Sequence, residues 1–158
     1  MTRCGIGYDA HRLVPGRKLI LGGVEIQHSL GLEGHSDADV LCHAIADALL
    51  GAIGESDIGH HFPNTDETIR GINSLEILAR VQDLLAEKRA RVVNVDATLI
   101  AEAPKIAPHL EAMRAKIAQA LQLEVSRVGL KATTNEGLGA IGRGEGMAAM
   151  AVASVESA

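Results

Sequence analysis

Two polar residues near the start of the chain, Asp9 and His11, are separated by a single residue. Because residues two apart in a β-strand point to the same face, about 6.5 to 7 Å apart, both side chains could bind one ion. His43 is a suitable third ligand, because it lies about 200° around its expected helix from the core residue Leu41 and should face away from the core. Asp47, one helical turn further on, could orient the His43 ring.

Two imidazoles and one carboxylate suit zinc, and three protein ligands leave a fourth position for substrate or water, as in catalytic zinc sites. The same spacing also fits a solvated strand end and an ordinary, partly buried histidine, because short motifs produce many false matches. The spacing therefore permits a zinc site at Asp9, His11 and His43 but does not establish one.

A second polar group, Thr133-Thr134-Asn135-Glu136, lies at the end of a predicted strand. Its hydroxyl and N–H groups could contact phosphate oxygens, and the Glu136 carboxylate could bind a hard cation such as Mg²⁺. Arg143, within Gly142-Arg143-Gly144-Glu145-Gly146, could also contact phosphate. The alternative for these residues is a solvated loop or turn. Residues 101–106, at a strand-to-helix junction, could recognise a base or an anion through backbone groups, or form an ordinary helix cap.

The elements that would position these residues are both strands and helices. Strands are expected at residues 3–8, 93–99, 128–134 and 147–155, and a hairpin at residues 18–26. One helix is expected to begin at Ser36-Asp37-Ala38-Asp39, which matches a capping pattern, and another at Asn73, with Glu76 three residues later. A third helix should carry the apolar stripe from Ile106 to Leu121 with Pro104 in its first turn. Residues 55–72 and 137–146 are expected to be loops.

This mixture of strands and helices predicts an α+β fold, a two-layer sandwich of a mixed β-sheet with helices on one face, with residues 1–158 forming one domain. The last strand, from Met147 to Ala153, has no polar alternation, so both of its faces should be covered. In a two-layer domain, the second cover could be another subunit.

Composition excludes several classes of protein. A net charge of −5 and a pI near 5.8 argue against a general binder of nucleic acid or of an anionic membrane. The two cysteines form no C-x-x-C motif, which favours a reducing, cytoplasmic location, and Cys42 fits a small core residue better than a metal ligand. Without a signal peptide or an apolar run that could span a bilayer, we expect a soluble, unprocessed protein.

Taken in order along the chain, these motifs resemble the 2-C-methyl-D-erythritol 2,4-cyclodiphosphate synthase family, and the resemblance spans nearly the whole chain. The matching segments are Gly7–His11, Gly22–Val24, His35–Val40, His43, Asp47–Gly51, Asp57–Gly59, Phe62-Pro63, Asn94–Asp96, Ala103–Lys105, Lys131–Thr134 and Gly142–Gly146. The resemblance implies a lyase of the non-mevalonate isoprenoid pathway. Such an enzyme converts 4-diphosphocytidyl-2-C-methyl-D-erythritol 2-phosphate to the cyclodiphosphate with release of CMP.

The resemblance also implies a cytoplasmic homotrimer with active sites between subunits, and it assigns roles by matching positions. Asp9, His11 and His43 would hold Zn²⁺, Glu136 would hold Mg²⁺ or Mn²⁺ at the substrate diphosphate, and His35 and Thr134 would stabilise the transition state. The erythritol phosphate would contact Ser36, Asp57, Ile58, Gly59, Phe62, Pro63, Asn64, Thr65 and Asp66. The cytidine would contact Ala101, Glu102, Ala103, Pro104, Lys105, Ile106 and Ala107, and further substrate contacts would come from Thr133, Asn135, Ala140 and Arg143.

Four residues differ from the usual family pattern. Asn64 stands where Asp is common, Glu102 where Gln is common, and Ala140 where Phe is common. Met150 replaces an acidic residue that some relatives have near the trimer axis, so no ligand is assigned to a cavity there.

Two other functions fit parts of the pattern. A zinc hydrolase could use the same three ligands with a metal-bound water, and it would incorporate water into its product. A non-catalytic, trimeric nucleotide-binding module would need neither the zinc ligands nor Glu136. The combination of a metal triad, a second cation site and a base-binding junction favours the synthase.

Overall fold

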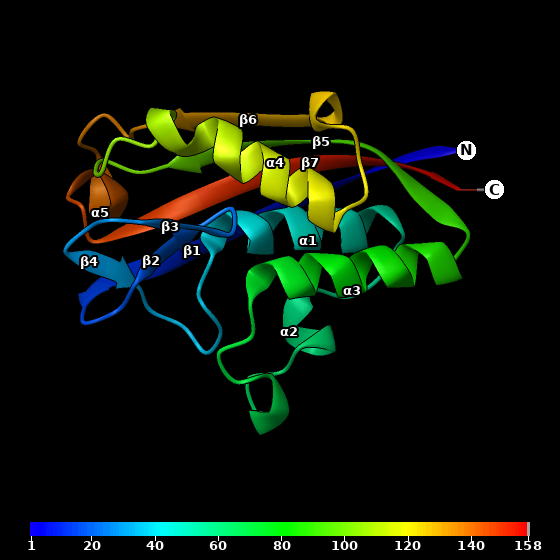
Figure 1. Ribbon diagram of the computed structural model, residues 1–158, viewed down its shortest axis with the longest axis horizontal. Helices are drawn as coiled ribbons and strands as arrows, with labels where there is room; N and C mark the ends of the chain where they lie inside the picture. Colours follow the sequence, from blue (N-terminus) through cyan, green and yellow to red (C-terminus); the bar gives the residue numbers. More distant parts are fainter. Residues whose placement is uncertain (158) are drawn as a thin grey trace.

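The computed structural model describes residues 1–157, which form a β-sheet with helices packed against one side (Figure 1). Within these residues the main sheet has five strands in the order β4-β1-β7-β5-β6. Strands β5 and β6 pair in parallel, whereas β1 pairs with β4 and β7, and β5 with β7, in antiparallel fashion. The strands are β1 (Thr2–Pro15), β4 (Leu30–Leu32), β5 (Ala90–Ile100), β6 (Val128–Thr133) and β7 (Gly146–Ser157). The predicted mixed sheet is confirmed.

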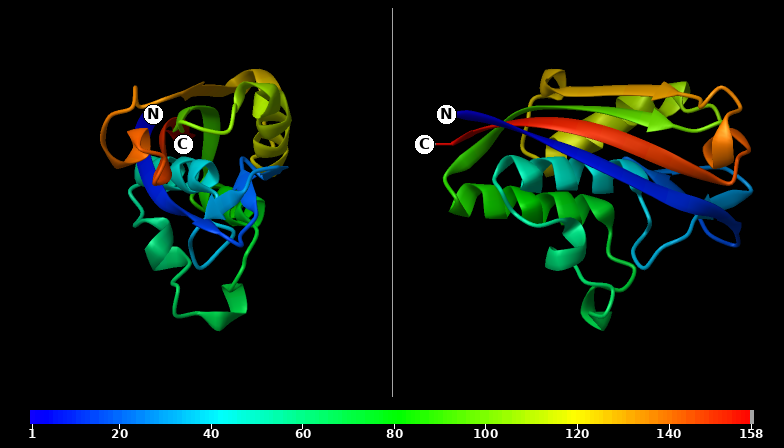
Figure 2. Two further views of the ribbon diagram at one scale, coloured as in Figure 1. Left: turned by 90° about the vertical axis from the view of Figure 1, so that its left-hand side faces the viewer. Right: turned by 180° about the vertical axis from the view of Figure 1, so that it is seen from behind.

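Three longer helices lie on the same side of this sheet, as the end-on view in Figure 2 shows. They are α1 (Val40–Ala52), α3 (Ser74–Glu87) and α4 (Leu110–Ala120). The predicted hairpin is also present, as the antiparallel pair β2 (Leu19–Leu21) and β3 (Val24–Ile26). The fold is therefore α+β, with helices on one face, as the sequence pattern predicted. No helix within residues 1–157 is long and apolar enough to cross a membrane.

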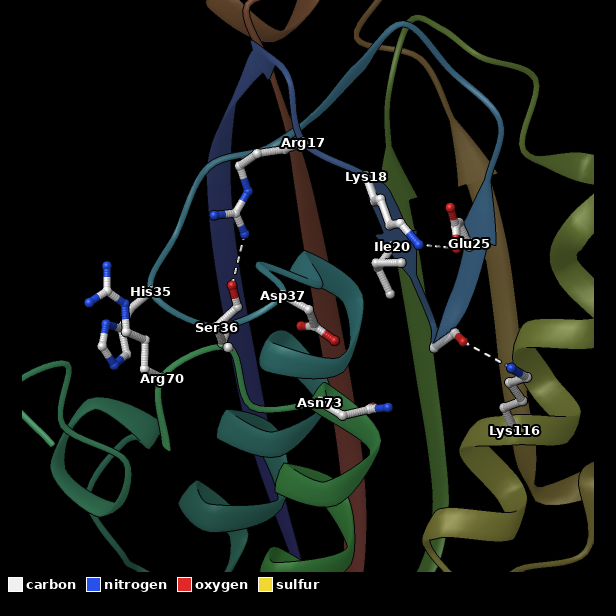
Figure 3. A pocket seen from close by; sticks show the side chains of 12 residues that line it. Arg17, Lys18, Ile20, Glu25, His35, Ser36, Asp37, Arg70, Asn73 and Lys116 are labelled. Carbon is white, nitrogen blue, oxygen red and sulfur yellow. Dashed lines mark hydrogen bonds and ion pairs between the residues drawn. The ribbon is translucent and has the colours of Figure 1, made fainter. Parts of the chain in front are cut away.

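The two predicted helix starts are confirmed by their capping contacts. The Asp39 side chain accepts a hydrogen bond from the N–H of Cys42 at the start of α1, and Asn73 accepts one from Leu75 at the start of α3. Asp39 is fully buried and also accepts from Gly22 N, Gly23 N and Ser74 Oγ. This carboxylate therefore joins the β2–β3 hairpin to two helices. The hairpin and the loop before α1 border the cleft drawn in Figure 3.

Helix α1 lies unusually close to strand β1 because two glycines face it. A Cβ atom at Gly7 would lie 1.8 Å from the carbonyl oxygen of Ala44, and one at Gly5 would lie 2.0 Å from that of Ala48. Only residues without a side chain permit this approach. Residues two apart share a strand face, so Asp9 continues the row of Gly5 and Gly7 towards the helix. The glycines therefore bring α1 within reach of the polar end of β1.

Three predicted segments differ from the structure. Residues 55–72 contain helix α2 (Ile58–His61) and the 3-10 turn η1 (Glu67–Ile69), because Asp57 and Asp66 cap these turns by accepting from His60 N and Thr68 N. The loop 137–146 contains helix α5 (Gly139–Gly142).

Pro104 does not lie in the first turn of a helix. The chain stays irregular through residue 106, and η2 (Ala107–His109) then leads into α4. The junction is tied to the loop after β6 instead, because the Glu102 carboxylate accepts from Asn135 N and Gly137 N. A third 3-10 turn, η3 (Val125–Arg127), precedes β6.

The face of the sheet opposite the helices carries exposed apolar side chains. In strand β7, Ala149 and Ala151 are buried, whereas Met150 and Val152 are 45% and 48% exposed. On β1, Ile6 and Tyr8 are 68% and 60% exposed. One side of the last strand is thus covered by this chain, and the other side is open at Met150 and Val152 in the single chain.

Candidate metal centre and substrate cavity

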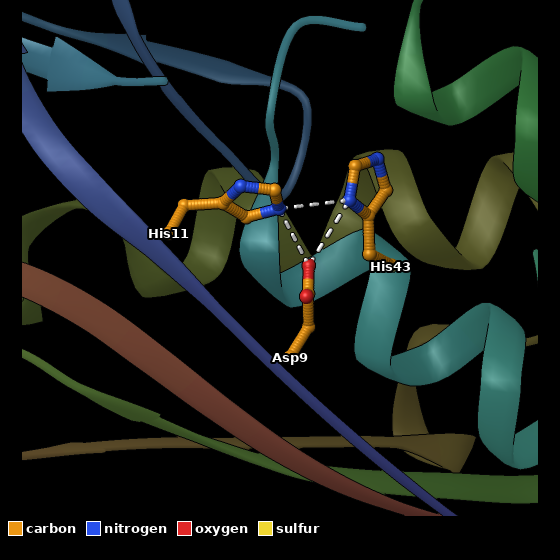
Figure 4. A group of neighbouring side chains, drawn as sticks. All are labelled: Asp9, His11 and His43. Carbon is orange, nitrogen blue, oxygen red and sulfur yellow. Dashed lines mark hydrogen bonds and ion pairs between the residues drawn. The ribbon is translucent and has the colours of Figure 1, made fainter. Parts of the chain in front are cut away.

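The side chains of Asp9, His11 and His43 meet between strand β1 and helix α1 (Figure 4). Asp9 Oδ2 lies 2.8 Å from His11 Nε2 and 3.1 Å from His43 Nδ1, and the two ring nitrogens are 3.4 Å apart. One ligand atom from each residue therefore lies within 4.8 Å of the others, as a single metal ion requires. The structure confirms that the three predicted ligands converge.

The other nitrogen of each ring has its own partner. His11 Nδ1 lies 2.8 Å from the carbonyl oxygen of Glu33, so this nitrogen carries the proton and donates it. His43 Nε2 lies 3.2 Å from Ser36 Oγ, to which it can donate. In the neutral rings, His11 Nε2 and His43 Nδ1 then keep their lone pairs for the centre. Such partners fix the tautomer and orientation of histidines that bind metals, so this donor set fits zinc.

The charges at this centre favour an ionised carboxylate. Burial raises the pKa of Asp9, but hydrogen bonds and positive charge from His11 and His43 outweigh burial and lower the pKa from 3.8 to about 2. Burial lowers the pKa of His11, but the hydrogen bond and charge of Asp9 have the larger combined effect and raise it above 6.5. Asp9 is therefore a carboxylate at neutral pH, ready to bind a cation.

One expectation about helix α1 is confirmed and one was wrong. His43 is buried, at 5% exposed, but its ring lines the metal cavity and is not part of the hydrophobic core. Asp47 does not orient His43. Its Oδ1 accepts a hydrogen bond from the N–H of Ile58 and so anchors helix α2.

A cavity of about 180 Å³ opens beside the three ligands. Of the residues expected to contact the erythritol phosphate, or to stabilise the transition state, six line this cavity: His35, Ser36, Ile58, Gly59, Phe62 and Asn64. Apolar side chains that the sequence interpretation missed complete the wall: Ile69, Ile72 and Ile77. From the sequence, these three isoleucines could be predicted only to pack in the core, and nothing in their spacing indicated a place in a cavity wall.

Four predicted contacts of the same segment, Asp57, Pro63, Thr65 and Asp66, do not line the cavity of the single chain. Asp57 and Asp66 use their carboxylates as turn caps. The guanidinium of Arg80 in α3 lies 5.9 Å from the centre of the Phe62 ring, a cation–π contact that the sequence interpretation also missed.

The second group of predicted residues lies outside this cavity. Within the described chain, none of the residues 101–107, 133–136, Ala140 or Arg143 lines it. The residues of this group contact one another: Glu102 binds the backbone of Asn135 and Gly137, and the N–H of Glu136 donates to Thr134 Oγ1. Every residue from 131 to 140 is exposed. A single chain therefore holds two separate halves of the expected site.

The remaining candidates behave as ordinary residues in the single chain. Arg143 forms an ion pair with Glu145 at 2.8 Å. Cys42 is fully buried, and burial raises the pKa of its thiol well above 9.0, so it is unsuited to act as a thiolate ligand, as expected.

Comparison with known proteins assigns the chain to a family. A sequence model described as the YgbB family matches residues 2–156. The protein of Alkaliphilus metalliredigens named 2-C-methyl-D-erythritol 2,4-cyclodiphosphate synthase is 61% identical over 153 residues, which are 97% of this chain and 96% of that protein.

Two solved structures have the same fold. The bifunctional IspDF of Campylobacter jejuni matches 100% of this chain with a TM-score of 0.95 and 40% identity, and the match spans 43% of that longer protein. IspF of Plasmodium falciparum, solved as a CDP complex, matches 99% of this chain and 96% of its own with a TM-score of 0.87 and 33% identity. The chain therefore belongs to the YgbB family, the family of the 2-C-methyl-D-erythritol 2,4-cyclodiphosphate synthases.

Proposed function

We propose that this chain, acting as one domain, converts 4-diphosphocytidyl-2-C-methyl-D-erythritol 2-phosphate to 2-C-methyl-D-erythritol 2,4-cyclodiphosphate and CMP. The observation that carries this proposal is the convergence of Asp9, His11 and His43 beside a cavity lined by His35 and Ser36. A curated relative with 61% identity is named for this product, and the CDP complex of the Plasmodium protein supports a cytidine-containing substrate.

Asp9, His11 and His43 would hold Zn²⁺, and Glu136 would hold Mg²⁺ or Mn²⁺. When bound, these cations supply positive charge that polarises the attacked phosphoryl group and stabilises the leaving phosphate. The contact of His11 Nδ1 with the Glu33 carbonyl, which fixes the His11 tautomer, supports the first assignment, and the exposed segment around Glu136 is consistent with the second.

The reaction needs positioning more than it needs a protein nucleophile. An oxygen of the substrate's 2-phosphate attacks the β-phosphorus, forming a new P–O bond. The bond from the β-phosphorus to the oxygen that bridges it to the α-phosphorus breaks, and CMP leaves with that oxygen. Because both reacting groups belong to one molecule, holding them in line accounts for much of the rate enhancement.

The cavity residues would hold the reacting groups. Ser36, Ile58, Gly59, Phe62 and Asn64 would bind the erythritol phosphate. His35 would donate a hydrogen bond to charge that develops during transfer. The buried Nε2 of His35 has no hydrogen-bond partner among residues 1–157, which leaves it available for this contact. Thr134 and residues 101–107 would bind the diphosphate and the cytidine.

We infer that the enzyme is a homotrimer, with each active site shared between two subunits. The two halves of the site are separate in one chain, so a neighbouring subunit would have to supply residues 101–107 and 133–136. The exposed apolar side chains Ile6, Tyr8, Met150 and Val152 on the uncovered sheet face support such an interface, because large exposed apolar patches commonly mark association surfaces.

Phosphorus NMR of the reaction tests the proposal. The protein is incubated with the cytidine diphospho substrate, Zn²⁺ and Mg²⁺. Two coupled signals of a cyclic diphosphate, together with free CMP, are expected. Linear phosphate products would favour a zinc hydrolase, and unchanged substrate with tight nucleotide binding would favour a non-catalytic module; either result would contradict cyclisation.

A further inference from the structure

The loop 33–39, between β4 and α1, carries two residues of the metal cavity, His35 and Ser36. It contains no helix or strand, so no regular hydrogen-bond ladder fixes its path. The proposed function nevertheless needs both side chains at defined places, because His35 donates to developing charge and Ser36 binds the erythritol phosphate. The position of the loop therefore depends on contacts from other parts of the chain.

Arg17 supplies two of these contacts from the turn between β1 and β2. Its half-buried guanidinium donates from Nη1 to the carbonyl oxygen of Gly34 at 3.0 Å and from Nη2 to that of Ser36 at 2.8 Å, and Figure 3 shows the second contact. One side chain thus bridges the carbonyl groups on either side of His35. Within residues 1–157 Arg17 forms no ion pair, so no carboxylate draws it away from the loop.

The backbone before helix α3 holds the same loop from another direction. The N–H of Gly71 donates to the carbonyl oxygen of His35 at 3.0 Å, and the N–H of Asp37 donates to that of Ile72 at 3.3 Å. Three successive carbonyl groups, of residues 34, 35 and 36, therefore have donors outside the loop. The two side chains remain free for the cavity: Nε2 of His35 is buried without a partner among residues 1–157, and Ser36 Oγ lies 3.2 Å from His43 Nε2.

The residue before His35 explains why the loop needs such support. A Cβ atom at Gly34 would lie 2.9 Å from the Cβ of Ala38, which is fully buried, and 3.3 Å from Cε1 of His11. A larger residue would press on the ring of a metal ligand, so glycine fits best. Glycine also has the most backbone freedom, which leaves this end of the loop with little rigidity of its own. The paired hydrogen bonds from Arg17 restrict that freedom.

We propose that Arg17 is a positioning residue for the reaction, which holds His35 and Ser36 at the metal cavity through its hydrogen bonds to the carbonyl groups of residues 34 and 36. This inference rests on the proposed function. Arg17 does not line the metal cavity, so it acts through the loop and not by touching substrate. Arginine suits this task, because its planar guanidinium presents several donors in a fixed geometry, whereas lysine presents one flexible ammonium group.

Arg17→Gln tests the proposal by two measurements on the zinc-loaded protein. Amide hydrogen exchange, followed by NMR, should show that protection of the Gly71 and Asp37 amides falls roughly tenfold or more, because the loop opens locally. Amides of strand β7 should keep parental protection, which shows that the protein remains folded. The kcat for CMP release should fall by about ten- to a hundredfold, as it does when groups that orient a site are lost.

Lys18→Gln is the matched control. It removes a positive charge from the next residue, but Lys18 pairs with Glu25 at 3.2 Å and donates no hydrogen bond to the loop. This variant should keep parental exchange and turnover. Arg17→Lys keeps the charge without the paired donors, and it should recover only part of the protection and of kcat.

Four results would overturn the proposal. Parental protection of Gly71 and Asp37 in Arg17→Gln would show that Arg17 does not hold the loop, and parental kcat with lost protection would show that holding it does not matter. An equal loss of kcat in Lys18→Gln, or full recovery in Arg17→Lys, would show that charge alone is needed. Exchange is measured without turnover, so a parent that fails to cyclise its substrate would refute the proposed function and not the contact of Arg17 with the loop.

Discussion

Replacing Gly7 by alanine should disrupt the metal centre without touching a metal ligand. The added Cβ would lie 1.8 Å from the carbonyl oxygen of Ala44 in helix α1, whereas real Cβ contacts below 3.0 Å are essentially never seen. Strand and helix would therefore have to separate by at least 1.2 Å, the difference between these two distances. The obstacle is backbone, so no side-chain rotation can relieve it.

This displacement is large compared with what a zinc site tolerates. Ligand distances in zinc sites vary by about 0.2 Å, and Asp9 and His43 belong to the two elements that must move apart. We expect zinc affinity to fall at least tenfold, as it does when the groups that orient metal ligands are lost. Overpacking of this kind should also lower the free energy of unfolding by about 1 to 3 kcal/mol.

The assay is competition for zinc against a chelating dye, together with thermal unfolding of the zinc-free protein. Gly51→Ala is the matched control, because it lies in the same helix and its added Cβ would approach Gly5 Cα and Ile6 O only to 3.9 Å. It should keep normal zinc affinity and gain up to about 1 kcal/mol of stability. Parental zinc affinity and stability in Gly7→Ala would refute the claim that close packing of β1 and α1 builds the site.

Three further predictions concern the cavity, the second cation and pH. Arg80→Met should raise KM about two- to fivefold with little change in kcat, because the cation–π contact holds Phe62 at the cavity. Arg80→Lys keeps the positive charge and should restore most of the parental KM. A lowered kcat with an unchanged KM would count against this positioning role. Glu136→Gln should keep zinc but lower turnover by on the order of a hundredfold, and near-normal turnover with unchanged Mg²⁺ dependence would remove Glu136 from the mechanism. The pKa of His11 is raised above 6.5, so protons compete with zinc for this ring, and dye competition should show zinc affinity falling as the pH drops through that raised pKa. A pH-independent affinity would contradict the contact of His11 with Asp9.

Local patterns predicted the elements that carry the site. The period-two spacing placed Asp9 and His11 on one face of a strand, and the capping patterns at residues 36–39 and at Asn73 located two helices. These features depend on neighbouring residues, which a sequence displays directly.

Tertiary contacts were harder to predict. Asp47 was expected to hold His43, but it binds the N–H of Ile58, because helix α2 folds back against α1. Pro104 suited a helix start, yet the contacts of Glu102 with the loop after β6 hold that junction in an irregular form. Both outcomes depend on segments distant in sequence, where local periodicity carries no information.

The closeness of α1 to β1 was also missed, although its signal is visible in the sequence. Gly5 and Gly7 alternate with Ile6 and Tyr8, so the strand has one face without side chains. Glycine on one strand face marks a close backbone approach, and here the approaching backbone belongs to the helix that carries His43.

The most direct test of intramolecular attack is the reaction run in ¹⁸O-labelled water, with mass spectrometry of both products. If the substrate's own 2-phosphate is the nucleophile, neither the cyclic diphosphate nor CMP gains an ¹⁸O atom, since every oxygen comes from the substrate. One ¹⁸O atom in a linear phosphate product would mean that water attacks instead, and it would make this chain a hydrolase.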